Sequence, residues 1–509
     1  MPEPANNKVF LLNASVFSWL RFGMKEYDLI LIGTGSGMEI VEAVIQNNHD
    51  IKVAVVDKDE PGGICLTRGC IPSKLLIYPA NIVRTVEKSI KFGIKTEIKS
   101  IDFKAVMERM RSIINRDITA ISNGLSKSKN IDYYTEQAEF TAPYTLKVGD
   151  ESVTSKLIFL STGSKPSVPP VDGLQETGYL TSDTILQLSK LPSSTTIIGG
   201  GYIAAEYGHF LSAMGSKVII IGRNPQFIPA EEPEISALAK WEMQKHATVL
   251  TNHEVSKVEI TSEGKKITAF DRYNKKETEI LANEIFVATG RRSNSDILHP
   301  EKAGIKTDPK GFIIADEYLQ TSQQNIWVLG DANGKFLFKH VANYEARIAY
   351  YNAILKKKVK VDYHAVPHAV FTDPEIASVA LGEKEAVEKY GKDNILIGFY
   401  KYADTAKGEA MAQKHDFVKV IVKRDTGKIL GAHIIGPQAS VLIQEIINMM
   451  YTEKQDFEPL NEAMHIHPAL SEVVARAFQT LMIPQQYHHY LEEHSNLPID
   501  IQKTSLTLA

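Results

Sequence analysis

The chain contains only two cysteines, Cys65 and Cys70, and both lie in the segment GGICLTRGCIPSK at residues 62–74. On a continuous α-helix, five residues advance about 7.5 Å along the axis, beyond the roughly 7 Å Cα separation that a disulfide tolerates. A bridge between the two cysteines therefore requires a break in the helix. Gly69 provides the backbone freedom for such a break, and Pro72 suits the first turn of a new helix. We expect Cys70 at or near that helix N-terminus, where the dipole favours a thiolate, and we interpret the pair as redox-active.

Arg68, between the cysteines, is a candidate second source of positive charge for the thiolate. The alternative is a pair of buried packing thiols, which the flanking glycines do not favour because buried thiols need no such backbone freedom. Two cysteines also exclude a disulfide-rich secreted scaffold, and a structural zinc site would depend on histidines and carboxylates.

The segment HIHPALSE at residues 465–472 contains His467 and Glu472. Dithiol chemistry needs a base that titrates near neutrality, which imidazole supplies, and a carboxylate at the far ring nitrogen would fix the tautomer and raise the basicity. A lone histidine is more often structural. His467 followed by Pro468 and Glu472 favours the catalytic interpretation.

A further group of titratable residues lies near the end of the chain. It comprises His488, His489, Glu492, Glu493 and His494. No other set of ligands accompanies these residues, so we interpret them as a solvated tail helix and expect no metal site.

Two glycine-rich loops predict the elements that position this chemistry. The first follows an apolar strand at 27–32, precedes a helical pattern, and is followed by a strand that ends at Asp57. Glycines in such a loop let the backbone approach a pyrophosphate at the helix N-terminus, and the acid accepts hydrogen bonds from a ribose. We predict a dinucleotide site rather than a plain βα turn, although Met38 replaces the expected small residue. The loop glycines are Gly33, Gly35 and Gly37.

The same arrangement returns between strands at 195–198 and 217–221. The second of these strands ends at Gly222 and Arg223, with no acid for a ribose 2′-hydroxyl, and the arginine favours a 2′-phosphate. We therefore predict NADP(H) over NAD(H); the alternative is that Arg223 is a solvated loop charge. The loop and first helical turn contain Gly199, Gly201, Tyr202, Ala204 and Glu206.

Composition limits the class of protein. A length of 509 residues suggests about three domains, and a net charge of −4 with 43% hydrophobic residues argues against a nucleic-acid binder and a disordered chain. No apolar stretch reaches the roughly 18 residues of a membrane span, so we expect a soluble, cytoplasmic protein. Residues 1–23 are interpreted as an extension, with a signal peptide as the alternative.

Several motifs together resemble the flavoprotein disulfide reductases, over about residues 25–481. The motifs are the cysteine segment, both glycine loops, Gly330-Asp331, FTDPEIAS at 371–378 and HIHPALSE. The resemblance implies an α/β fold with two Rossmann-like dinucleotide-binding domains, for FAD and NAD(P), and a C-terminal α+β dimerisation domain. The expected boundaries are 1–23 extension, 24–155 and 285–362 FAD domain, 156–284 NAD(P) domain, 363–482 dimerisation domain and 483–509 tail.

The resemblance also implies roles for individual residues. Cys70 would face the flavin as the charge-transfer thiolate, and Cys65 would exchange with the substrate. Lys74 would lie near the flavin N5 with Glu206 as its partner, Tyr202 would cover the nicotinamide side, and His467, oriented by Glu472, would act as base from the other subunit of a homodimer. The residues expected at the cofactors are Gly33, Gly35, Gly37, Asp57, Gly62, Gly63, Lys74, Gly163 and Asp331 for FAD, and Gly199, Gly201, Tyr202, Ala204, Arg223 and Gly290 for NAD(P).

Within this family the motifs favour a dihydrolipoamide dehydrogenase, with lipoamide as substrate and a lipoyl-bearing complex as partner. The alternative is an NADPH-dependent reductase of mycothione or another low-molecular-weight disulfide. A flavin-bound interaction or signalling protein is a third reading, and the complete set of reactive residues argues against it. Thr67 and Arg68 depart from the Asn-Val common in the family, so the charge preference for the substrate stays open.

Overall fold

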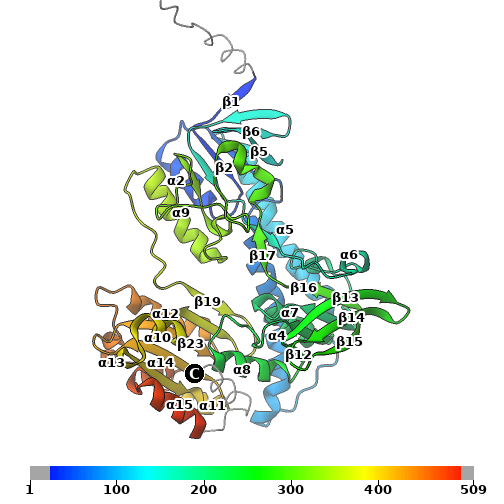
Figure 1. The fold of residues 1–509 in the computed structure, drawn as a ribbon, viewed down its shortest axis with the longest axis vertical. Coiled ribbons are helices and arrows are strands. Elements are labelled where there is room, and N and C mark those ends of the chain that lie inside the picture. The colour runs from blue at the N-terminus through cyan, green and yellow to red at the C-terminus, as the bar shows by residue number, and fades with distance from the viewer. Residues whose placement is uncertain (1–22, 494–509) are drawn as a thin grey trace, which may run out of the picture. The chain divides into compact units, whose positions relative to one another are not determined.

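The structure is a computed structural model that describes residues 23–493. These residues form two compact units (Figure 1). The first consists of the described residues up to Thr67, Arg116–Lys165 and Arg292–Val361. The second consists of Arg68–Asn115, Pro166–Arg291 and the described residues from Asp362 onward. The finer division into three domains stays a prediction, and residues 1–22 of the expected extension lie outside the described residues.

The first unit is built on a five-stranded parallel sheet of order β18-β8-β2-β3-β4. Its strands are β2 (Leu29–Ile32), β3 (Val53–Val56), β4 (Ile131–Tyr134), β8 (Ile158–Leu160) and β18 (Ile326–Val328). Counted along the chain, they lie in the order 3-2-1-4-5, as in a Rossmann fold. The first glycine loop therefore leaves the sheet at the carboxyl end of its central strand.

Side chains of β2 enter two different cores, because successive residues of a strand point to opposite faces. Leu29 and Leu31 pack in the core formed with α2 and α9, whereas Ile30 and Ile32 pack toward a small second sheet. The covering elements are α2 (Met38–Asn47), α9 (Lys339–Ala353), β1 (Met24–Glu26), β5 (Ala138–Ala142), β6 (Thr145–Val148) and β7 (Glu151–Thr154).

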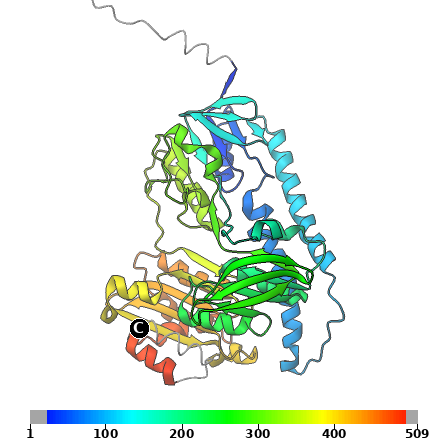
Figure 2. The same ribbon diagram turned by 45° about the vertical axis from the view of Figure 1, so that its right-hand side comes forward.

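The second unit contains another parallel sheet, of order β12-β11-β10-β16. A three-stranded antiparallel sheet, green in Figure 2, is inserted between β12 and β16. The elements are β10 (Ser194–Ile198), α7 (Tyr202–Met214), β11 (Lys217–Gly222), α8 (Pro233–Met243), β12 (Thr248–Thr251), β13 (His253–Thr261), β14 (Gly264–Asp271), β15 (Lys276–Ala282) and β16 (Glu284–Val287). Here too the second glycine loop follows the strand that is first in sequence and internal in the sheet.

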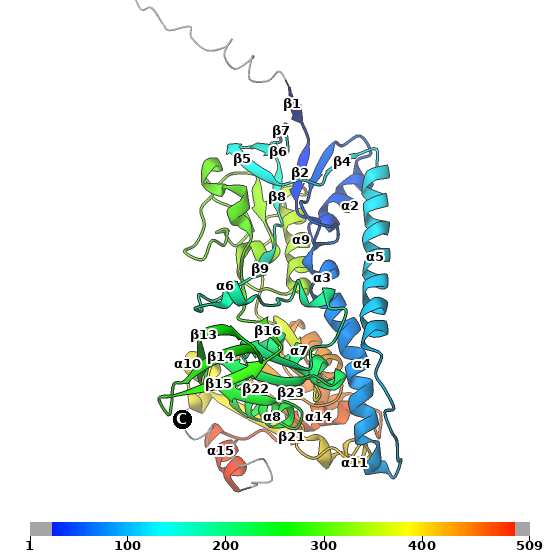
Figure 3. The same cartoon turned by 90° about the vertical axis from the view of Figure 1, so that its right-hand side faces the viewer.

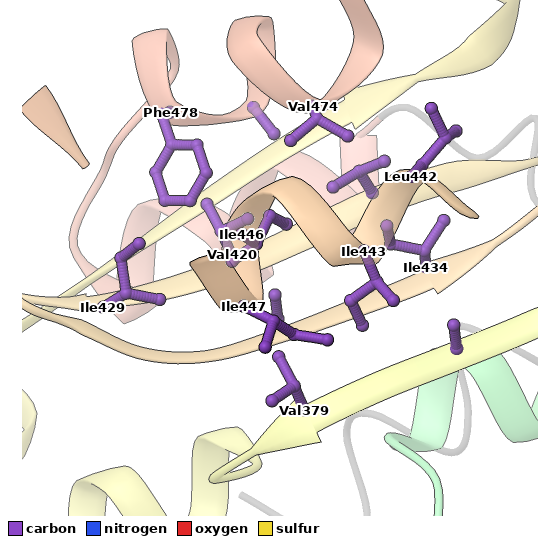
Figure 4. Packing of buried hydrophobic residues seen from close by; sticks show 14 of the residues in the cluster. Val379, Val420, Ile429, Ile434, Leu442, Ile443, Ile446, Ile447, Val474 and Phe478 are labelled. Atoms are coloured by element: carbon purple, nitrogen blue, oxygen red, sulfur yellow. The ribbon is translucent and has the colours of Figure 1, made fainter. Parts of the chain in front are cut away.

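Beyond residue 362, the second unit contains a five-stranded antiparallel sheet covered by helices. Figure 4 shows Ile443, Ile446 and Ile447 of α12 and Val474 and Phe478 of α14 packed around residues of this sheet. The strands are β19 (Pro367–Val370), β20 (Ile376–Ala380), β21 (Ile395–Lys401), β22 (Phe417–Lys423) and β23 (Ile429–Ile435), with helices α10 (Glu383–Tyr390), α11 (Ala406–Ala410), α12 (Ala439–Met450), α13 (Glu458–Glu462) and α14 (Ser471–Gln479). This region carries the mixed α+β character expected beyond residue 362.

Two long helices, α4 (Cys70–Lys88) and α5 (Phe103–Lys127), stand out in Figure 3. The short helices are α3 (Gly63–Thr67) and α6 (Leu174–Thr177), and β9 (Ser164–Pro166) and β17 (Arg291–Ser293) are short strands. Across residues 23–493, no helix is both long enough and apolar enough to cross a membrane.

The C-terminal segment forms the predicted helix, α15 (Pro484–Glu493), and His489, Glu492 and Glu493 are exposed as expected. The prediction of a peripheral, fully solvated tail is wrong for the opposite face of the helix. Tyr487 is fully buried (0% exposed) and Leu491 is buried. The segment is held before the helix by reciprocal backbone hydrogen bonds between Met482 and Ile397 of β21. Pro484, Tyr487 and Leu491 define one apolar face at helical spacing, which the surrounding histidines and glutamates obscure in the sequence.

Two histidines of α15 contact acidic side chains. His488 Nε2 lies 2.7 Å from Glu383 Oε1, and His489 Nε2 lies 3.1 Å from Glu493 Oε1. His494 lies outside the described residues. Between residues 23 and 493, no three histidine, cysteine or acidic side chains are grouped so as to hold a metal ion.

Candidate functional site

The helix break predicted between the two cysteines is confirmed. Cys65 lies in α3, which ends at Thr67, and Cys70 is the first residue of α4. Gly69 has φ −127° and ψ −117°, outside the helical region. Cys70 is exposed and Cys65 is partly buried. The more exposed cysteine is thus the residue at the helix N-terminus, where the dipole lowers the cost of a negative charge.

Arg68, in the break itself, is not an isolated charge. Its Nε lies 3.8 Å from Asp183 Oδ2, and both side chains are about one-third exposed. Asp183 therefore offsets part of the positive charge that the sequence places beside the cysteines. A partly exposed pair at this distance contributes little to stability.

Lys74, one turn into α4, is joined to Glu206 of α7. Its Nζ lies 2.9 and 2.8 Å from the two carboxylate oxygens. The backbone N–H of Phe371 donates to the same carboxylate at 3.2 Å, and the Phe371 ring centroid lies 4.4 Å from Nζ. The ammonium is fixed on one side by charge and on the other by an aromatic face.

His467 and Glu472 form a second ordered pair. His467 Nδ1 lies 3.0 Å from Glu472 Oε1, and the Ala469 amide donates to Oε2 at 3.2 Å. The hydrogen bond from His467, with smaller contributions from Ala469 and Arg476, lowers the pKa of Glu472. The His467 side chain is 67% exposed. Its ring is oriented through one nitrogen, which leaves Nε2 for proton transfer at the surface.

The first glycine loop bends where a side chain would collide with the sheet. Gly33 has φ +98°, and a Cβ there would overlap the Ser161 carbonyl oxygen. Asp57, at the end of β3, accepts from the backbone N–H of Thr34 at 2.8 Å and from its hydroxyl at 2.6 Å. Thr34 Oγ1 in turn accepts from the N–H of Gly62 at 3.0 Å. Asp57 therefore organises the loop while its carboxylate keeps further acceptor sites for a ribose.

Helix α9 supports this loop through residues that the sequence analysis did not select. Lys339 Nζ donates to Ser36 Oγ at 2.8 Å, and Ser36 Oγ lies 2.8 Å from Asn343 Oδ1. The buried Glu345 accepts from the Gly330 amide at 2.6 Å. One helix thus fixes both the first glycine loop and the loop that carries Asp331, whose carboxylate accepts from Ser164.

The second glycine loop repeats the geometry of the first. Gly199 has φ +131°, and a Cβ there would overlap the Ala288 carbonyl oxygen. Tyr202 is the first residue of α7, and its ring lies 5.4 Å from that of His368 between centroids. Burial, with a further effect of Glu231, raises the pKa of Tyr202, so the hydroxyl stays neutral. His368 Nε2 is hydrogen-bonded to Glu231 Oε1 at 2.8 Å. The sequence analysis did not select His368.

Arg223 directly follows β11, as predicted, and its side chain is exposed. A second arginine contacts the same backbone. Arg272, in the turn between β14 and β15, donates from Nη1 to the Arg223 carbonyl oxygen at 3.1 Å. The turn is held there by backbone hydrogen bonds from Arg272 to Asn252 (2.9 Å) and from Asn252 to Asn224 (2.7 Å). Arg272 could not be predicted from the local pattern, because it lies 49 positions beyond Arg223.

Both loops have the shape that a dinucleotide requires. Around Gly35 no atom comes closer than 3.9 Å to the position of an added Cβ, and around Gly201 none lies within 4 Å. Neither α2 nor α7 has a side chain that caps its first amides. Open backbone at an uncapped helix N-terminus is where a pyrophosphate binds. Gly290 is open as well, whereas Gly63 packs against Gly35 and Gly163 against Ile64; Ala204 is fully buried.

Comparison with known families decides the class of protein. The family described as pyridine nucleotide-disulphide oxidoreductase matches residues 27–389, and its dimerisation domain matches residues 366–478. The chain belongs to the pyridine nucleotide-disulphide oxidoreductases. It is therefore an FAD-dependent enzyme of this family, and the predicted fold class of two Rossmann-like domains and a dimerisation domain is confirmed.

Known members of the family include several enzymes at similar distance from this chain. It is 34% identical over 471 residues to the mycothione reductase of Mycobacterium tuberculosis H37Rv, covering 89% of this chain and 99% of the relative. It is 32% identical over 468 residues to the dihydrolipoyl dehydrogenase of Bacillus subtilis, covering 89% and 97%. The solved structure of the HOCl-induced flavoprotein disulfide reductase RclA from Escherichia coli superposes with a TM-score of 0.77 at 26% identity, over 89% and 99% of the two chains.

Proposed function

We propose that this enzyme is a homodimeric disulfide reductase that transfers two electrons from NADPH to a low-molecular-weight disulfide. The observation that carries this proposal is the end of β11, where the Arg272 guanidinium donates to the Arg223 carbonyl oxygen. The strand ends in Gly222 and Arg223, without the acid that would bind a ribose 2′-hydroxyl. A 2′-phosphate there would gain charge-assisted hydrogen bonds worth about 1.5–3 kcal/mol, roughly ten- to hundredfold in binding.

FAD, when bound, supplies a two-electron relay between the nicotinamide and the cysteine pair. Asp57 and the amides of the first loop would hold its adenosine and pyrophosphate, and Asp331 its ribityl chain. Lys74, fixed by Glu206 at 2.8 Å, would place a positive charge beside the isoalloxazine N5. The remaining chemistry belongs to side chains of this protein.

The Cys65 thiolate would attack one sulfur of the substrate disulfide, forming a mixed disulfide and releasing the first thiolate. His467 would protonate that leaving group. The Cys70 thiolate would then attack the Cys65 sulfur, which releases the second thiolate and closes the Cys65–Cys70 bridge. The two electrons of NADPH reopen this bridge, so that NADPH, one proton and one disulfide give NADP⁺ and two thiols.

His467 would serve the cysteines of a second subunit. Its imidazole is largely exposed, and Met464 and Ile466, just before it, are 101% and 78% exposed. Large apolar side chains of this kind are normally covered, and the dimerisation domain found at residues 366–478 supports a second copy of the chain as that cover. A monomer in light scattering would contradict this arrangement.

The second candidate is dihydrolipoamide dehydrogenase activity, which the sequence motifs favour first. The segments CIPSK and HPALSE support it, and the relatives of that function are nearly as similar as mycothione reductase. A lipoyl-bearing complex would then be the partner. A cytoplasmic location stays a prediction in either case.

Steady-state kinetics separate the two candidates. Reduction of lipoamide, a glutathione-type disulfide and a mycothiol-type disulfide is measured with NADPH and with NADH, together with NAD⁺-dependent oxidation of dihydrolipoamide. We expect kcat/KM for a low-molecular-weight disulfide to be about tenfold or more higher with NADPH. Faster turnover with NADH and lipoamide would instead establish the dehydrogenase and leave Arg223 as a surface charge.

A further inference from the structure

The turn between β14 and β15 contributes a residue to the end of β11 that the family resemblance does not assign. We propose that Arg272 is a second ligand of the NADPH 2′-phosphate, acting beside Arg223 and contributing to nucleotide selection. The inference rests on the proposed use of NADPH. It extends that proposal by assigning part of the selectivity to the inserted antiparallel sheet.

The backbone fixes Arg272 at this position independently of its side chain. Asn252, between β12 and β13, has φ +61° and bonds on one side to Asn224 and on the other to Arg272. Arg272 then donates to the carbonyl oxygen of Arg223. A guanidinium has five N–H donors in one planar fork, so a single bond to a carbonyl leaves others for a phosphate.

The two arginines lie at the edge of the sheet where a nucleotide binds. In open α/β sheets, ligands occupy the crevice outside the carboxyl ends of the strands, and Arg223 directly follows the carboxyl end of β11. The loop after β11 returns to the glycine loop, because the Ile228 amide donates to the Gly200 carbonyl at 2.7 Å. The adenosine end of a nucleotide whose pyrophosphate lies at Gly201 would therefore reach the arginines.

The acid nearest to Arg272 in sequence is engaged within the turn. Asp271 Oδ1 accepts from the amides of Tyr273 (2.9 Å) and Asn274 (3.0 Å), and Oδ2 accepts from Asn274 Nδ2 at 2.7 Å. His253 lies 3.8 Å from the same carboxylate. The carboxylate is therefore directed into its own turn, while both arginine side chains are exposed.

A third donor is present on the loop after β11. Gln226 Nε2 is buried and has no hydrogen-bond partner within the described part of the chain. A buried amide donor without a partner is costly. A nucleotide phosphate or ribose at this loop would supply the missing acceptor. The unpartnered Gln226 amide thus supports a ligand here independently of the two arginines.

The test uses two probes, 2′,5′-ADP and 5′-AMP, which differ only in the 2′-phosphate. Isothermal titration calorimetry on the FAD-loaded enzyme gives the dissociation constant of each probe for the wild type, Arg223→Gln, Arg272→Gln and Arg272→Lys. The control is Lys266→Gln, on β14 near the other end of the same hairpin, where the lysine pairs with Glu259 and Glu279. It removes one charge from the same sheet without touching β11.

We expect Arg272→Gln to weaken 2′,5′-ADP about tenfold and to leave 5′-AMP within about twofold. Arg272→Lys should fall in between, because lysine keeps the charge but loses the planar fork. Lys266→Gln should match the wild type with both probes.

Three outcomes would overturn the inference, and they are distinguishable. If Arg223→Gln weakens 2′,5′-ADP but Arg272→Gln does not, NADPH use stands and the role of Arg272 is wrong. If Arg272→Gln weakens both probes equally, the residue only holds the turn in place. If the wild type binds both probes equally, the proposed NADPH preference itself fails.

Discussion

Lys419 and Glu232 form a buried ion pair with 2.6 Å between Nζ and Oε2, and the lysine side chain is 0% exposed. Two further carboxylates share the same ammonium, Glu383 at 2.7 Å and Glu234 at 3.2 Å. The Tyr487 ring lies 4.8 Å from Nζ, and its hydroxyl donates to Glu234 at 3.1 Å. One cation therefore holds together α8, α10, β22 and α15.

Replacement of this lysine should be strongly destabilising. Lys419→Met leaves three acidic side chains without their cation in a buried site, and the loss of one partner of a buried pair costs about 3–5 kcal/mol. Urea unfolding followed by circular dichroism should show a corresponding shift of the transition. Lys423→Met on the same strand removes an exposed pair with Asp425 and should change stability by less than about 1 kcal/mol. Equal effects of the two substitutions would contradict the stabilising role of the buried ion pairs of Lys419.

The docking of α15 should depend on pH through His488 and Glu383. Their hydrogen bond raises the pKa of His488 above 6.5, so its contribution is complete below about pH 6.5 and is lost as pH rises through the raised value. Lys419 and His488, opposed by burial, lower the pKa of Glu383 to about 2, so its contribution is complete above about pH 4.5 and is lost toward pH 2.

Between about pH 4.5 and 6.5 both groups therefore stabilise the fold. The difference in Tm between the wild type and His488→Gln should be largest in this window and should shrink toward pH 9. His489→Gln, whose ring is 66% exposed, serves as the matched control and should show little pH dependence. A Tm difference for His488→Gln that stays constant from pH 5 to 9 would rule out this linkage.

The two cysteines should differ in their spectroscopic effect. With FAD bound, Cys65→Ser should show a long-wavelength thiolate-to-flavin absorbance without prior reduction, because Cys70 at the start of α4 remains as a thiolate. Cys70→Ser should not show that absorbance, even after two-electron reduction. Identical spectra for the two variants would reverse or abolish the proposed roles.

His467→Ala should lower disulfide turnover by about 10² to 10⁴, the range for a lost acid-base group. The reduction of bound FAD by NADPH, measured by stopped flow, should remain as fast as in the wild type. His489→Ala should change neither rate. Equal loss in both half-reactions would show that His467 does not act on the thiols.

The local part of this architecture was predictable, and the long-range part was not. Neighbouring residues were enough to predict both glycine loops, Asp57 and the break at Gly69, because strand, loop and helix follow one another in sequence. Arg272, Glu345 and Lys419 become significant only through partners brought close by folding. A single sequence contains no signal for such pairs.

Amphipathic spacing gave one opportunity that the sequence analysis missed. Tyr487 and Leu491 lie on the same face of a helix, as core residues do, and Tyr487 is fully buried. The polar composition of the surrounding residues outweighed this pattern in the prediction. The prediction from polar composition therefore missed the buried face of the helix.

The arrangement around Lys419 also sets an order of events during synthesis. Glu232 and Lys419 are 187 positions apart, so at about 5–20 residues per second a ribosome adds the lysine roughly 10 to 40 s after the glutamate. During that time the acidic residues near the start of α8 have no cation to neutralise them and must stay in contact with water. The parallel sheet of the nascent chain can form before this happens. The acidic residues of α8 become buried only after β22 and α15 have been synthesised.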